Sequence, residues 1–131
     1  MVPELALWLV PLAAALLSYR FARTSIWRNT GFALGLVISP ASLGLYSLYF
    51  LGPLAAVLGM LGLVLSMLHG PPGYQLAIAL GLIPSHTVIS GASAAPVELL
   101  NAVVWSVFYG TLGWAIDAWR SRHHRMSSNA V

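Results

Sequence analysis

Two groups of arginines frame an almost continuous series of apolar segments in this chain. The first arginine group is Arg20, Arg23 and Arg28, and the second arginine group is Arg120, Arg122 and Arg125. Charged residues make up 7% of the sequence and hydrophobic residues 59%. Basic residues beside membrane spans are retained on the cytoplasmic side. The two groups therefore predict an integral membrane protein that holds both of them on that side.

The composition excludes a soluble globular protein, in which about a quarter of the residues are charged. The polar residues within the apolar segments are mainly Ser, Thr and Gly, so no charged face recurs at the helical period of 3.6 residues. We expect a single transmembrane helical domain over residues 1–119. A basic, disordered cytoplasmic tail is expected over residues 120–131.

The net charge of +3 comes from arginines that lie next to apolar segments. We expect these arginines to contact anionic lipid headgroups, at about 1 kcal/mol per basic residue, and not nucleic acid. The absence of cysteine excludes disulfides and iron–sulfur clusters. The absence of lysine is typical of GC-rich coding sequences, and we expect the bacterial cytoplasmic membrane as the location.

Four apolar segments are clear: 5–19, 30–50, 54–69 and 97–119. Glu4 precedes the first segment and the basic residues follow it, which is the opposite polarity to a cleaved signal peptide. We therefore expect a retained first span with its N-terminus outside. Gly52 and Pro53 form a tight break after the second segment, so segments 30–50 and 54–69 are expected to form a helical hairpin.

The segment 74–90 is ambiguous because Pro84 interrupts it. If both arginine groups are cytoplasmic, an even number of crossings must separate them, and segments 30–50, 54–69 and 97–119 supply only three. This parity predicts that 74–90 also crosses. The expected fold is all-α and polytopic, with five membrane segments, the fourth broken at Pro84, the N-terminus outside and the C-terminus inside. The alternative is a re-entrant half-helix at 74–90, with the first segment at the interface.

Residues 33–42 resemble residues 79–93, since Ala-Leu-Gly-Leu and Val-Ile-Ser recur in both. A parallel duplication of a two-helix unit would explain the similarity. Coincidence in a sequence rich in Ala, Leu, Gly, Val and Ser would explain it as well.

Small residues recur four positions apart on two of the segments. Such stripes let membrane helices approach closely, either within one chain or between chains of an oligomer. The candidate packing residues are Gly31, Gly35, Ser39, Ala102, Ser106 and Gly110.

Glu98 is the ionisable residue with the greatest functional interest. A carboxylate at the centre of a membrane costs roughly 2.5–3.5 kcal/mol, so its presence indicates a ligand or ion site. Asn101 follows one turn later, and His86 lies beside Pro84, where a broken helix frees backbone carbonyls. If 74–90 crosses, His86 and Glu98 approach the same leaflet and can pair. The structural interpretation is a capping carboxylate in the first turn of segment 97–119 and an exposed histidine.

Two further polar sets have local explanations. Asp117 and Arg120 are spaced to form an interfacial ion pair. His69 stands at the end of segment 54–69, and together with His123 and His124 it would be the one conceivable metal cluster. Adjacent histidines on a tail are poorly arranged for metal binding, so we expect no metal site.

No nucleotide-binding loop, metalloprotease motif, nucleophile elbow or carboxylate pair occurs, and no cofactor is implied. The sequence therefore predicts a small non-enzymatic membrane protein that acts through helix–helix contacts, as an accessory, immunity-type or assembly protein. The expected partner in these contacts is a second copy of the chain or another membrane protein. The alternative is a small transporter or pore with a broken-helix site near His86 and Glu98.

Overall fold

The computed structural model describes residues 3–86, 88 and 94–128, and these form helices and turns with no strand. Three helical stretches are long and apolar enough to cross a membrane: Arg23–Leu51, Pro53–Ala79 and Ala94–His123. A shorter apolar stretch covers Leu5–Phe21. The prediction of an all-helical membrane protein is confirmed at this level.

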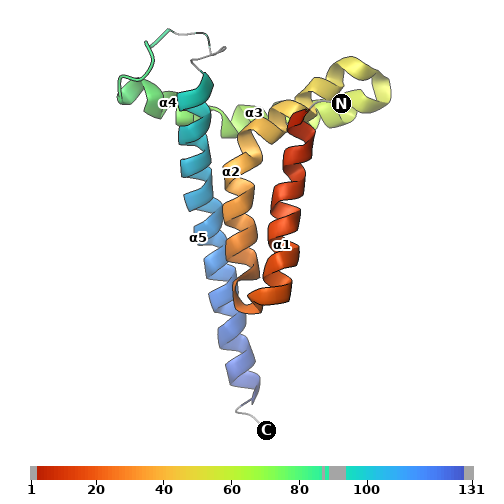
Figure 1. Ribbon diagram of the computed structural model, residues 1–131, viewed down its shortest axis with the longest axis vertical. Helices are drawn as coiled ribbons and strands as arrows, with labels where there is room; N and C mark the ends of the chain where they lie inside the picture. Colours follow the sequence, from red (N-terminus) through yellow and green to blue (C-terminus); the bar gives the residue numbers. More distant parts are fainter. Residues whose placement is uncertain (1–2, 87, 89–93, 129–131) are drawn as a thin grey trace.

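Three helices lie side by side as a bundle (Figure 1). They are α1 (Leu9–Phe21), which follows the 3-10 helix η1 (Pro3–Trp8), the first part of α2 (Ile26–Ser47), and α5 (Ala94–Ser128). The short 3-10 helix η2 (Arg23–Ser25) joins α1 to α2. The most extensive helix contact is between α2 and α5, which run antiparallel. Both arginine groups consequently lie toward the same end of the bundle.

α2 bends near Pro40. Proline lacks the N–H that would bond the carbonyl of Leu36, and its ring clashes with the preceding turn, so helices kink at this position. Beyond the bend, the rest of α2, the 3-10 helix η3 (Leu48–Leu51) and α3 (Pro53–His69) lie across the end of the bundle (Figure 1). We call residues 41–69 the arm.

The arm turns at the predicted Gly52-Pro53 break, but its first half is the end of α2 with η3 and not the whole of segment 30–50. It is built on glycines. Gly52 makes the turn with a φ of 132°, which side chains rarely permit. Gly59 and Gly62 place α3 directly against the backbone of Tyr49 and Tyr46, where a Cβ atom would overlap it. The close approach holds the two halves together by backbone packing.

α4 (Pro71–Ala79) follows α3 after Gly70 and ends in a Schellman motif. Leu82 N–H donates to Ala77 O at 2.8 Å, Gly81 N–H donates to Ile78 O at 2.9 Å, and Gly81 has a φ of 69°. A helix of this length is about 13 Å long, far short of a hydrocarbon core of about 30 Å. The structure therefore does not confirm the crossing at 74–90. Residues 87 and 89–93 lie outside the described part.

The two similar stretches have different structures. Gly35 lies within α2 and is buried, whereas Gly81 ends α4 in a left-handed conformation. The shared Ala-Leu-Gly-Leu sequence therefore occupies a helix interior in one place and a helix end in the other. The described part of 79–93 gives no structural support for a duplication.

α5 extends through the second arginine group to Ser128. The sequence analysis predicted a disordered tail from residue 120 instead. Several of the tail residues, Arg and Met among them, have good helix propensity, so the helix can continue beyond the bundle.

Candidate functional site

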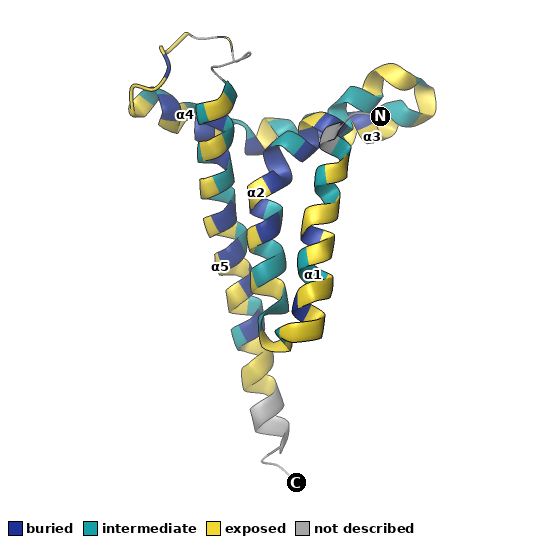
Figure 2. Cartoon of the chain, viewed as in Figure 1, coloured by how far each residue is buried: buried dark blue, intermediate teal, exposed yellow. Residues whose placement is uncertain are grey.

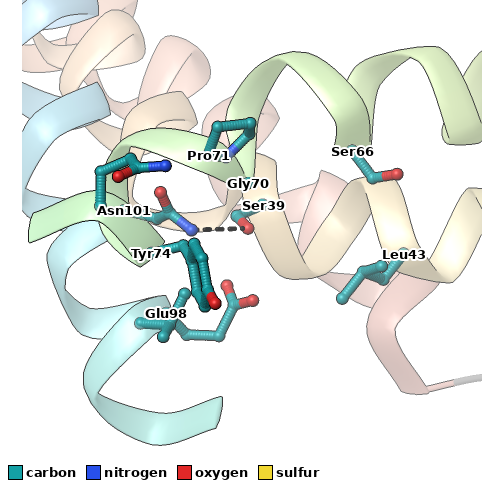
Figure 3. A pocket seen from close by; sticks show the side chains of 10 residues that line it. Ser39, Leu43, Ser66, Gly70, Pro71, Tyr74, Glu98 and Asn101 are labelled. Carbon is teal, nitrogen blue, oxygen red and sulfur yellow. Dashed lines mark hydrogen bonds between the residues drawn. The ribbon is translucent and has the colours of Figure 1, made fainter. Parts of the chain in front are cut away.

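A cavity of about 650 Å³ lies where the bend of α2, the end of α3, α4 and the start of α5 meet. Its size falls within the range of small-molecule sites, about 300–1,000 Å³. Figure 3 shows Glu98, Tyr74 and Asn101 around one part of it and Leu43 and Ser66 around another. Residues that line the cavity include Ser39, Leu43, Ser66, Tyr74, Glu98 and Asn101.

Asn101 joins three helices in the wall of this cavity. It is 1% exposed, its Oδ1 accepts the Gly73 N–H at 2.7 Å, and its Nδ2 donates to Ser39 Oγ at 3.4 Å. A side chain at position 73 would overlap Asn101 Oδ1, so glycine is required for this contact. Asn101 is thus committed to holding α4 and α2 against α5.

Glu98 lines the same cavity from the second turn of α5. Because α5 already begins at Ala94, Glu98 does not occupy the first turn in which a carboxylate would cap the helix. Its Oε2 atom is buried and has no hydrogen-bond partner. The expectation of a capping carboxylate is therefore not met, and Glu98 is left uncommitted.

His86 does not share this site. It is exposed, in a turn after Pro84, and it is not among the residues that line the cavity. The residue before it, Ser85, is linked to a cavity-lining side chain, because the Tyr74 hydroxyl donates to the Ser85 carbonyl at 3.2 Å. Within the described residues, the expected pair of His86 and Glu98 is not formed.

The candidate packing residues meet in one interface, between α2 and α5. A Cβ atom at Gly31 or Gly35 would overlap the backbone of Tyr109 or Ser106, respectively. Ser106 Oγ donates to Phe32 O at 3.2 Å. The interface also includes a contact that the sequence analysis missed, since Gly113 lies directly against the backbone of Trp27 and Arg28. Ser39 is bonded to Asn101 of α5, and Ala102 is half-buried. The residues predicted from sequence were Gly31, Gly35, Ser39, Ala102, Ser106 and Gly110.

Asp117 has a different partner from the one predicted. Its carboxylate accepts the backbone N–H groups of Trp27 at 3.3 Å and Arg28 at 2.9 Å. These are free donors in the first turn of α2, so Asp117 caps that helix from α5. Arg120 is exposed, and the described contacts include no ion pair between the two residues. The partners lie too far apart in sequence for any local spacing to reveal them.

His69 is a buried structural residue at 4% exposure. Its Nδ1 lies 2.7 Å from Leu65 O, which can only accept, so this nitrogen carries the proton. In the neutral ring Nε2 then accepts the Tyr109 hydroxyl at 2.7 Å. The Trp105 indole packs against the imidazole with the two rings tilted by 56°, and it donates to the His69 carbonyl at 2.8 Å. The sequence analysis identified neither Trp105 nor Tyr109.

Of the conceivable metal cluster, His69 and His123 lie apart, and the side chain of His124 lies outside the described part. His123 packs against Trp119 near the far end of α5, whereas His69 contacts Trp105 and Tyr109. Positions 109 and 123 are about 21 Å apart along a helix. The described residues contain no group of three side chains suited to hold a metal ion.

The ionisable side chains of the apolar region thus differ in whether they are free to bind a ligand. His69 and Asp117 are held by hydrogen bonds that build the fold, while Glu98 faces a cavity with no partner. Comparison with protein-family models, curated proteins and solved structures gives no match for this chain.

Proposed function

We propose that the chain is a non-catalytic integral membrane protein that acts through helix contacts of its arm, as an accessory, immunity-type or assembly protein of a bacterial cytoplasmic membrane. Catalysis by covalent or acid–base steps needs several groups that converge on one point. Glu98 stands alone in its cavity, and the two other described candidates, His69 and Asp117, are held by structural hydrogen bonds.

The observation that carries the proposal is the outer surface of α3. The helix contacts the rest of the chain along the narrow face that includes Gly59 and Gly62 (Figure 2). Its remaining surface consists of exposed Leu, Val and Met side chains: Leu54, Val57, Leu58, Met60, Leu61, Val64, Met67 and Leu68. Rows of such side chains can interlock with those of a helix from another membrane protein.

The arm also supports a membrane placement with three crossings. The part of α2 from Ile26 to Pro40 is about 22 Å long at 1.5 Å per residue, and a helix layer laid across it adds about 10 Å. Their sum approaches the hydrocarbon thickness of about 30 Å. We infer that α1, the straight part of α2 and α5 cross, and that the arm lies within the outer leaflet. Both arginine groups are then cytoplasmic, and the N-terminus is outside. The even number of crossings required between the two groups is supplied by α2 and α5 alone.

Accessibility of a cysteine at position 75 separates this placement from five crossings. Gln75 is exposed on α4, so we expect Gln75→Cys to react with a membrane-impermeant maleimide from the outer side of intact cells. With five crossings, position 75 would lie at the cytoplasmic end of the fourth segment and react only after permeabilisation. Ser121→Cys is the cytoplasmic control, and the native chain contributes no cysteine of its own.

Site-specific photocrosslinking tests the role of the arm. Leu61 on α3 and Leu112 on α5 are both 51% exposed, so they form a matched pair. We expect benzoylphenylalanine at position 61 to give one discrete protein adduct in intact cells, because a partner helix covers this face. The same group at position 112 should react with lipid. Recurrence of the adduct at Val57 and Val64 would support a helix contact, and lipid adducts alone at all three arm positions would contradict it.

A further inference from the structure

The cavity beside Glu98 has the chemistry of a cation site. Its uncommitted charged group is a carboxylate, and none of the described residues that line it is basic. Oε2 of Glu98 is buried without a hydrogen-bond partner. Buried charges in proteins are ordinarily paired, because an isolated one loses its hydration without compensation. A ligand that pairs with this oxygen would bring positive charge or hydrogen-bond donors.

The neighbouring side-chain donors bond elsewhere in the fold. Ser66 Oγ donates to Leu63 O at 2.9 Å, and the Tyr74 hydroxyl donates to Ser85 O at 3.2 Å. The amide of Asn101 donates to Ser39. In the described structure none of these donors reaches Glu98 Oε2, and Gln75 is exposed at the rim.

Prolines reduce the number of backbone donors in the same walls. Pro71 lines the cavity, Pro72 follows it, and Pro40 adjoins the lining residue Ser39. Each lacks an N–H, so these three positions offer no backbone donor to the carboxylate of Glu98.

Size and apolar lining distinguish an organic cation from a metal ion. Leu43, Val97 and Pro71 contribute apolar surface to a cavity of about 650 Å³, and the half-buried ring of Tyr74 stands beside the carboxylate (Figure 3). Aromatic rings attract ammonium groups through their π faces. A metal ion would require several oxygen ligands at short range, and the described side chains offer one carboxylate.

We propose that this cavity binds a small amphiphilic ammonium, a protonated amine with an apolar body, with its charge against Glu98 and its body against Leu43 and Val97. This inference is independent of the docking role of the arm. The proposed ligand site contains Glu98 but not His86, which does not line the cavity.

Fluorine NMR of the full chain in phosphatidylcholine nanodiscs tests the site. The probe is para-trifluoromethylbenzylammonium, and its neutral counterpart is para-trifluoromethylbenzyl alcohol. We expect saturable binding of the ammonium, weakened about tenfold or more in Glu98→Gln, and no saturable binding of the alcohol. Asp117→Asn makes the same carboxylate-to-amide change far from the cavity and should leave probe binding unchanged.

Three results would overturn the proposal: equal binding by Glu98→Gln, equal binding of the alcohol, or displacement of the probe by millimolar sodium as effectively as by a second amine. Glu98→Gln removes no described hydrogen bond, so we expect it to fold. If it does not, modification of Glu98 by dicyclohexylcarbodiimide in the wild-type chain decides the question. The ammonium should protect Glu98 from modification, and absence of protection would contradict the site.

Discussion

Gly35→Ala is expected to lower the free energy of unfolding by about 1–3 kcal/mol, the usual range for overpacking. The added methyl group would overlap the backbone of Ser106, which cannot rotate away as a side chain could. α2 and α5 would have to separate along their whole contact. The hydrogen bond from Ser106 to Phe32 O, at 3.2 Å, would weaken with them.

Gly110→Ala is the matched control on the partner helix. A Cβ atom there would lie 3.6 Å from the nearest atom of Phe32, an ordinary van der Waals contact. We expect its effect to stay within about 0.5 kcal/mol of the wild type. Unfolding by dodecyl sulfate in mixed micelles, followed by circular dichroism, measures both variants. Equal stability of the two would show that the α2–α5 contact is looser than its geometry indicates.

The sequence allowed a correct prediction of an all-helical fold with helices apolar enough to span a membrane, and of the turn at Gly52-Pro53, because these follow from local hydropathy and local turn residues. The sequence did not predict which apolar segments lie along the bundle and which lie across its end. The parity argument assumed that every long apolar segment crosses the membrane. The bend at Pro40 directs residues 41–69 across the bundle instead, and both arginine groups lie toward the same end although the described part of 74–90 contains no helix of spanning length.

Candidate site residues were predictable where their chemistry was unusual for a membrane segment. Glu98 and Asn101 stood out as polar residues one turn apart, and the structure places both in one cavity. His86 was grouped with them on the assumption of a fourth crossing, which the end of α4 at Ala79, followed by the left-handed Gly81, does not support. Residues whose partners are remote, such as Trp105 and Tyr109 around His69, gave no sequence signal.

Asp117→Ala is expected to lower the free energy of unfolding by about 2 kcal/mol, within the range for hydrogen bonds to charged groups and for helix caps. The substitution would leave the N–H groups of Trp27 and Arg28 without their acceptor at the start of α2. It would also release the contact that fixes this end of α2 to α5. Asp117→Asn retains one carbonyl oxygen, so we expect a loss of about half that size.

Arg120→Ala distinguishes the cap from the ion pair that the spacing of Asp117 and Arg120 predicts. If the carboxylate acts through α2, removal of the exposed Arg120 should change the stability by less than about 0.5 kcal/mol, as for most surface charges. If it acts through the ion pair, Arg120→Ala and Asp117→Ala should destabilise the chain equally. The double variant completes the cycle, because independent effects add and those of paired residues do not. Additivity in micelles would assign Asp117 to the backbone of α2.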